Sequence, residues 1–300
     1  MRETAAGCPI DTGSRQATYD GCGRLSVQNQ GDSEVAFTHD TASRLAVYRI
    51  QDQKAELVVS SELTYDEFGR ETARTVKRGE EVLLTIIQEF NTLGLIESRS
   101  MQDGHASILR SKGFKYDDYN CLMYYEYSGP QAPPDEQGRL LQSQSFTFDN
   151  FDNIANKTTV CQGDQGQKVT TYQYILLDPT QLLKITNDNP EYTPEIVLEY
   201  DADGRLTRDE QGRIMDYDTL GRLIRVRDKD QELLCEYRHD AAGKLVAQIA
   251  PGQPDTYLFY SEKSPIATKT GESRISYLSD GKTFWGQIVQ NTESAQQPES

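Results

Sequence analysis

The sequence lacks the residue patterns that indicate disulfide-stapled, zinc-binding and membrane-spanning proteins. Its five cysteines are scattered, odd in number and never spaced as Cys-x-x-Cys, which argues against a disulfide framework and a zinc site. No apolar stretch reaches the roughly 18 residues of a membrane span. The N-terminus has no apolar run of the kind that forms a secretory signal. We expect no metal or other cofactor, no membrane span, and synthesis in the cytosol with reduced thiols.

Positive charge is also scarce. The formal net charge of −16 argues against binding to nucleic acid or to an anionic membrane surface, because both need clustered Lys and Arg. The simplest interpretation is that the charge maintains solubility. An alternative is that the acidity tunes an enclosed or partner-facing surface.

Long stretches with apolar residues every three to four positions are absent, which excludes a helical bundle. Tyr (17) outnumbers Phe (9), and there are 22 Gly residues. Such a composition is typical of many short strands joined by turns. The sequence therefore predicts an all-β protein.

An internal repeat organises the chain. The phrase Asp-x-x-Gly-Arg-apolar occurs three times between residues 200 and 223, starting at Asp201, Asp209 and Asp218. Tyr precedes the first and third copies. The aromatic residue suits a half-buried strand, Asp forms a turn with backbone amides, and Gly adopts positive φ without steric cost. Each unit therefore predicts a strand, a hairpin turn and a second strand.

Degenerate copies extend this pattern over most of the chain. We predict the structural turn positions Gly23, Gly69, Gly94, Asn120, Gly138, Gly204, Gly212, Gly221 and Gly243, with Ser43 and Asp152 in two further copies. Asn and Asp are the residues that tolerate the left-handed region best after Gly. Substitution thus follows backbone geometry rather than chemistry, which favours a structural role for the motif and predicts no catalytic residue.

The pattern also predicts the organisation of the chain. We expect a loosely ordered N-terminus over residues 1–16, a repeat β-sheet region over residues 17–290 and a disordered polar tail over residues 291–300. Residues 129–134 contain three prolines and should form an edge loop. Residues 178–194, which contain three X-Pro pairs, should form a long polar connection.

Several residue groups could carry chemistry but have simpler explanations. Residues 201–204 superficially resemble a calcium loop, but Gly is fourth rather than sixth, so turn formation explains them better. His39 and His239 occupy the Tyr position before a repeat Asp and suit strands better than metal ligation. Carboxylate pairs such as Asp228 and Asp230 arise by chance in a chain this acidic, and they argue only weakly for a glycosidase.

The Arg and Tyr of the repeat have two interpretations each. The repeat Arg could bind an anionic partner, but pairing with a carboxylate on a neighbouring strand is the simpler prediction. The repeat Tyr could stack on sugars, but cross-strand packing is the simpler one.

The repeated Tyr-Asp-x-x-Gly-Arg-Leu resembles the YD repeat of the Rhs family. Within that family, residues 178–182, 200–223, 256–260, 277–281 and 285–287 are most similar to the C component of bacterial toxin-complex (Tc) insecticidal toxins. The resemblance covers roughly residues 17–290. It implies an antiparallel sheet wound into a curved or spiral wall, part of a hollow shell.

The resemblance also implies a function. Such shells hold a toxic polypeptide cargo, and a B component closes the shell with the C component. The chain ends at Ser300 before the family's self-cleaving core signature, so we expect wall only, without enzymatic activity. The implied protein is made in the bacterial cytoplasm and secreted without a classical signal peptide. The alternative is an extracellular repeat module that binds carbohydrate or protein.

Overall fold

The computed structural model describes residues 16–30, 32–52, 56–163, 166–279 and 283–291. Every regular secondary-structure element in these residues is a β-strand, so the predicted all-β architecture is confirmed. Residues 1–15 and 292–300 lie outside the described residues, and so do almost all of the predicted loose N-terminus and polar tail. The chain divides into two compact units, which are described separately.

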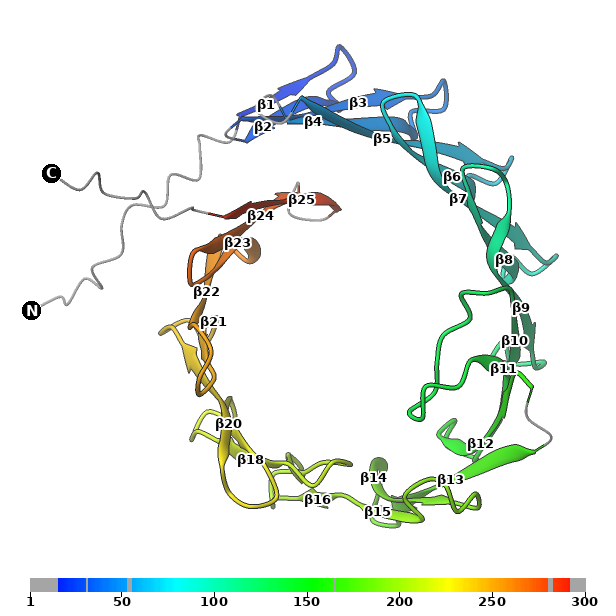
Figure 1. Ribbon diagram of the computed structural model, residues 1–300, viewed down its shortest axis with the longest axis vertical. Helices are drawn as coiled ribbons and strands as arrows, with labels where there is room; N and C mark the ends of the chain where they lie inside the picture. The colour runs from blue at the N-terminus through cyan, green and yellow to red at the C-terminus, as the bar shows by residue number, and fades with distance from the viewer. Residues whose placement is uncertain (1–15, 31, 53–55, 164–165, 280–282, 292–300) are drawn as a thin grey trace, which may run out of the picture. The chain divides into compact units, whose positions relative to one another are not determined.

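The first unit comprises residues 1–171 and 187–194. Its strands follow one another in sequence order, and each pairs antiparallel with the next, as the ribbon in Figure 1 shows. The strands are β1 Gln16–Tyr19, β2 Leu25–Gln30, β3 Ser33–His39, β4 Leu45–Asp52, β5 Leu57–Tyr65, β6 Glu71–Arg78, β7 Glu81–Phe90, β8 Ile96–Asp103, β9 Ile108–Tyr116, β10 Leu122–Ser128, β11 Leu141–Phe148, β12 Ile154–Cys161 and the first part of β13 Gln167–Ile175.

The second unit comprises residues 172–186 and 195–300. Its strands also pair antiparallel with their neighbours in sequence, except that β15 ends one sheet and β16 begins another, and several of its strands are much shorter. The strands are β14 Asp178–Asn187, β15 Glu195–Val197, β16 Glu199–Tyr200, β17 Leu206–Arg208, β18 Ile214–Tyr217, β19 Leu223–Arg227, β20 Leu233–His239, β21 Leu245–Ile249, β22 Thr256–Ser261, β23 Ser264–Thr270, β24 Ser273–Ser279 and β25 Phe284–Asn291.

The prediction of a long polar connection over residues 178–194 is wrong for its first ten residues, which form β14. Pro179 is the second residue of that strand, where a missing backbone donor interrupts little of the ladder. Further along, Lys184 pairs with Val197 in the register, and its Nζ lies 2.6 Å from a Glu195 carboxylate oxygen. Only residues 188–194 remain as a loop.

Regular bulges adapt the ladder to the turns. In the hairpins closed by repeat turns, the register shifts at the last residue before the Asp, for example between Thr64 and Tyr65 and between Asp216 and Tyr217. A bulge increases local twist and bends the strand. The same irregularity recurs in most hairpins that carry the motif, but no shift occurs at the Asp209 turn, where the β17–β18 pairing is a single residue pair.

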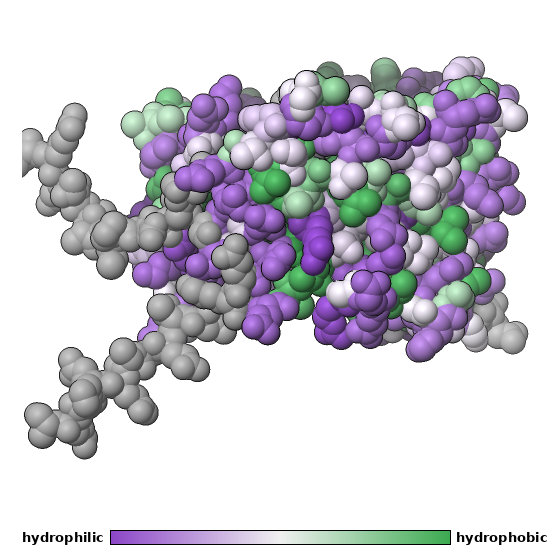
Figure 2. Space-filling model, turned by 90° about the horizontal axis from the view of Figure 1, so that it is seen from above, coloured by the Kyte–Doolittle hydropathy of each residue, from purple (hydrophilic) through white to green (hydrophobic). Residues whose placement is uncertain are grey.

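Little of the protein is deeply buried. The one buried hydrophobic cluster assigned among the described residues contains Tyr127, Ala132, Leu141 and Cys161. Ala132 belongs to the proline-rich segment 129–134, which is a loop as expected, yet the side chain is only 4% exposed. On the face shown in Figure 2, hydrophilic residues predominate and hydrophobic residues form small separate groups. Stability must therefore come largely from contacts that repeat along the sheet.

Candidate functional site

The carboxylate of the repeat Asp closes each turn from inside. In the turn at Asp218, one carboxylate oxygen accepts the amides of Leu220 and Arg222, each at 2.9 Å. The other accepts the Arg222 Nε at 2.7 Å. Backbone bonds join the Gly221 amide to the Asp218 carbonyl and the Asp218 amide to the Arg222 carbonyl. A single side chain thus accepts two of the loop's backbone amides and anchors its Arg.

All the predicted turn positions lie in the left-handed region. Their φ angles, together with those of Ser43 and Asp152, lie between 62° and 82°. Each donates its amide to the carbonyl of the Asp or Asn three residues earlier. The structure distributes these residues over successive hairpins of both units. They do not line one common pocket.

Two further turns of the same kind have neither Gly nor Asn at the left-handed position. Ala106 (φ 60°) and Gln231 (φ 72°) occupy the left-handed position after Asp103 and Asp228. In both loops, two backbone amides donate to the Asp carboxylate, and the same two backbone hydrogen bonds close the turn. The signal that could have found them is an Asp at the end of a strand or directly after it, as Asp103 ends β8 and Asp228 follows β19, rather than the glycine.

The prediction that each repeat Arg pairs with a carboxylate on a neighbouring strand is wrong. Arg44 Nε instead lies 2.7 Å from the carboxylate of Asp40, in its own turn. The same local pairing holds for Arg24, Arg70, Arg139, Arg205, Arg213 and Arg222. The five-residue loop brings these charges together, so no partner across the sheet is needed.

The rest of the guanidinium reaches the next turn on the same edge. Arg44 Nη1 donates to the Asp66 carbonyl at 3.1 Å, and Arg222 Nη1 donates to the Asp240 carbonyl at 3.2 Å. Arg44 also lies over the ring of Tyr65, 4.7 Å from its centroid. Arg205 over Tyr217 repeats the contact at 5.3 Å. The Arg therefore links one repeat to the next through a hydrogen bond, a cation–π contact or both.

The repeat Tyr contacts the preceding turn on the same edge, whereas the repeat Arg contacts the following one. The Tyr65 hydroxyl donates to the Leu45 carbonyl at 2.7 Å, and the Tyr217 hydroxyl donates to the Leu206 carbonyl at 2.8 Å. In both cases the acceptor is the residue after the Arg of the preceding repeat on that edge. Every residue type of the consensus phrase is thus used in closing a turn or in joining two turns.

The hydrogen bonds of the turn also set the acidity of its carboxyl. The Arg222 amide lowers the pKa of Asp218 most, burial opposes it, and the Arg222 guanidinium lowers it further. Burial is the largest influence on Asp209, which is 3% exposed, but hydrogen bonds from Arg213 outweigh it and lower the pKa. The pKa values of nine turn carboxyls are lowered in this way: Asp20, Asp40, Asp66, Asp103, Asp135, Asp149, Asp201, Asp209 and Asp218.

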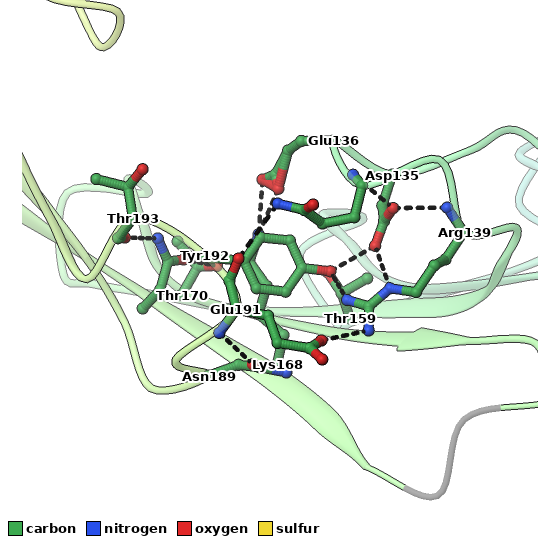
Figure 3. A network of polar contacts seen from close by, with 12 residues as sticks. Asp135, Glu136, Arg139, Thr159, Lys168, Thr170, Asn189, Glu191, Tyr192 and Thr193 are labelled. Carbon is green, nitrogen blue, oxygen red and sulfur yellow. Dashed lines mark hydrogen bonds and ion pairs between the residues drawn. The ribbon is translucent and has the colours of Figure 1, made fainter.

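One turn of the first unit is embedded in a larger polar network, shown in Figure 3. The Tyr192 hydroxyl, from the 188–194 loop, donates to Asp135 and accepts from the Arg139 guanidinium. Arg139 also reaches Glu191 at 2.8 Å. Burial and the neighbouring Asp135 raise the pKa of Tyr192 to about 12.

A buried lysine supports this network. Lys168 is 6% exposed, and its Nζ lies 3.4 Å from the centroid of the Tyr192 ring. The same Nζ donates to both carboxylate oxygens of Glu136 at 2.6 and 2.7 Å. These contacts fasten the 188–194 loop to the Asp135 turn and to β13. Sequence reasoning missed them because the partners lie more than twenty residues apart in the chain.

The other candidate residues take structural places. Asp201, in the loop that resembles a calcium site, accepts the Asp203 and Arg205 amides and the Arg205 Nε. His39 and His239 are the last residues of β3 and β20. Within the described ranges, no group of three or more His, Cys, Asp or Glu residues is placed to hold a metal ion. The same residues contain no helix long and apolar enough to cross a membrane.

The sheets are antiparallel meanders in which one repeated motif closes the hairpin turns and connects each turn to the next on the same edge. This arrangement defines a β-repeat protein of the shell-forming class. The sequence matches the Teneurin YD-shell family over residues 48–270, and the chain belongs to that family. This confirms the resemblance to YD-repeat proteins. A search of curated protein sequences found no match.

Solved structures of toxin complexes share the fold. The Photorhabdus luminescens Tc holotoxin pore matches with a TM-score of 0.63 and 13% identity over 93% of this chain. The TcdB2-TccC3-TEV crystal structure gives 0.63 and 13% over 95%, and TcdB2-TccC3 gives 0.59 and 14% over 93%. The chain spans only 15–16% of the length of these proteins.

Proposed function

We propose that this chain is a segment of shell wall that encloses or scaffolds a toxic polypeptide cargo together with a B-like partner component. The observation that carries the proposal is the interlocking of successive turns by the repeat Arg and Tyr. Such a device extends a sheet without requiring a deep core. The fold shared with the toxin-complex structures supports a role of this kind.

We also propose that the wall is not an enzyme. The Asp, Arg and Tyr of the motif have the functional groups that acid–base chemistry needs. In the turns described above, however, the carboxylates accept amides and guanidinium groups, and the Tyr hydroxyls donate to carbonyls. Groups committed to these bonds hold the backbone rather than a substrate.

A second candidate function, a binding module, rests on the tips of the hairpins. Phe68, Tyr119 and Phe151 occupy the residue before the left-handed position, and their side chains are 74%, 87% and 69% exposed. They come from turns on the same edge of the first unit. If the protein binds glycans, Tyr119→Ala should abolish the binding. If it only builds a wall, that variant should behave as the parent.

The cysteines fit synthesis in a reducing compartment. Among the described residues, Cys22, Cys121, Cys161 and Cys235 form no disulfide. We propose synthesis in the bacterial cytoplasm followed by secretion that does not use a classical signal peptide.

Protease protection tests the proposed enclosure. An unstructured reporter peptide would be fused to the full chain and expressed with a Tc B component, and its digestion rate compared with that of the same reporter on an unrelated β-protein. We expect digestion to slow at least tenfold only when the B component is bound. Full-rate digestion in a purified complex of both components would contradict the enclosure.

A further inference from the structure

We infer that the first unit carries an anion site for a short carboxylate-rich peptide, on the sheet face formed by β6 to β9. The site is a half-open hollow of about 430 Å³. Its cationic lining consists of Arg74, Arg99, Arg110 and Lys112, against a single carboxylate, Glu71. The inference rests on the proposed function only in naming a polypeptide as the ligand.

The strand register brings three of these cations together. Arg99 lies directly opposite Lys112 across the β8–β9 pair, and Arg110 lies opposite Met101, two residues further along β8. Directly opposite side chains have Cβ atoms about 5 Å apart, and diagonal ones about 7–8 Å. Like charges in these positions repel one another, so the arrangement costs stability unless an anion offsets it.

These three cations have no carboxylate partner among the described residues, although the chain is strongly acidic. Arg99 donates to the neutral amide oxygen of Gln88 at 2.8 Å. Lys112 lies over aromatic rings, 4.5 Å from the centroid of Tyr127 and 5.4 Å from that of Tyr125. Only Arg74 is neutralised locally, by two 2.9 Å bonds to Glu71. The motif arginines, by contrast, each hold a carboxylate.

Glutamate or aspartate side chains suit this lining. Guanidinium groups bind carboxylates through two parallel hydrogen bonds, and the charge strengthens both. Four strands about 4.8 Å apart span roughly 14 Å, which is the length of about four extended residues at 3.3 Å each. The hollow therefore accommodates a short acidic segment rather than a single small anion.

The net charge of −16 does not prevent local binding. At 0.1 M salt the Debye length is about 10 Å, comparable to the size of the cluster, so nearby charges dominate the potential in the hollow. A long polyanion such as nucleic acid would extend beyond the hollow and meet the excess negative charge. The site therefore selects a short acidic stretch within an otherwise uncharged or mixed sequence.

Fluorescence anisotropy with a labelled hexaglutamate peptide tests the site on the full chain at 0.1 M salt. We expect saturable binding that Arg110→Gln/Lys112→Gln weakens at least tenfold. The matched control, Arg78→Gln/Lys229→Gln, removes the same charge from exposed cations outside the hollow and should change binding less than twofold. Equal weakening in both variants, or no binding to the parent, would overturn the proposal.

Two further arms keep the result interpretable. Arg110→Lys/Lys112→Arg keeps both charges and should bind within threefold of the parent, and tenfold weakening would refute a charge-based site. Pyrophosphate should compete only weakly, since it contacts one part of the hollow. Tight pyrophosphate binding without hexaglutamate binding would replace the peptide site with a small-anion site. These assays need no cargo or B component, so their failure is distinguishable from failure of the enclosure.

Discussion

Gly221→Val tests whether the backbone conformation of the turn, rather than its packing, requires glycine. Gly221 has φ +77°, and an added Cβ would lie 3.6 Å from Arg205 Nη1, an ordinary van der Waals contact. Space is therefore available, and the cost must come from the left-handed conformation. That conformation costs an L-residue about 1–2 kcal/mol, and a β-branched side chain lies at the upper end. We expect a loss of about 2 kcal/mol in unfolding free energy.

Urea titration followed by circular dichroism measures this loss, and two variants control it. Gly221→Asn should cost less than about 1 kcal/mol, because Asn tolerates positive φ and Asn120 already occupies the equivalent position at φ 67°. Gly243→Val should cost as much as Gly221→Val, although nothing lies within 4 Å of its Cβ position. The reasoning fails if Gly221→Val is within about 0.5 kcal/mol of the parent, or if Asn is as harmful as Val.

Three further predictions concern the side chains of the turns. Tyr217→Phe should cost about 1 kcal/mol because it removes the hydrogen bond to the Leu206 carbonyl and keeps the ring; an unchanged urea midpoint would count against the link. Asp209→Asn should lower the unfolding free energy by about 1–3 kcal/mol, because it weakens charge-assisted hydrogen bonds at a buried side chain. The control Asp203→Asn changes a side chain that is 72% exposed and should leave the unfolding free energy nearly unchanged. Equal losses in the two variants would refute the role of burial. Because the turn carboxyls have lowered pKa values in the folded state, they stabilise it above the unfolded pKa of about 3.9 and lose this effect as pH falls through the folded values. Melting temperature should therefore fall steeply below about pH 4, and a constant or rising value from pH 5 to pH 3 would contradict the assignment.

The sequence predicts this fold well because its main signal is local. An Asp followed three residues later by Gly specifies a turn within five residues, so the hairpins at Gly69 and Gly221 need no knowledge of distant partners. The turns at Ala106 and Gln231 escape notice because the carboxylate can hold a non-glycine residue at positive φ. The motif is therefore defined more by its Asp than by its Gly.

Features that depend on contacts between distant residues cannot be predicted from the repeat motif. The segment that forms β14 has two X-Pro pairs nearby and polar residues within it, and only its pairing with the neighbouring strands β13 and β15 shows that it is a strand. The partners of the repeat Arg lie in its own loop and in the next turn, a geometry that linear spacing does not display. The Asp135–Tyr192 contact and the cationic hollow likewise arise from register and loop placement.

A double-mutant cycle on Arg44 and Tyr65 measures most directly whether one repeat is joined to the next. The two side chains belong to successive turns and lie 4.7 Å apart, from guanidinium carbon to ring centroid. Arg44→Met, Tyr65→Leu and the double variant should give a coupling energy of about 0.5–1 kcal/mol. The distant pair Arg44 and Tyr277 should give a coupling near zero. A coupling indistinguishable from that of the distant pair would show that the turns stand independently and would contradict the interlocked wall.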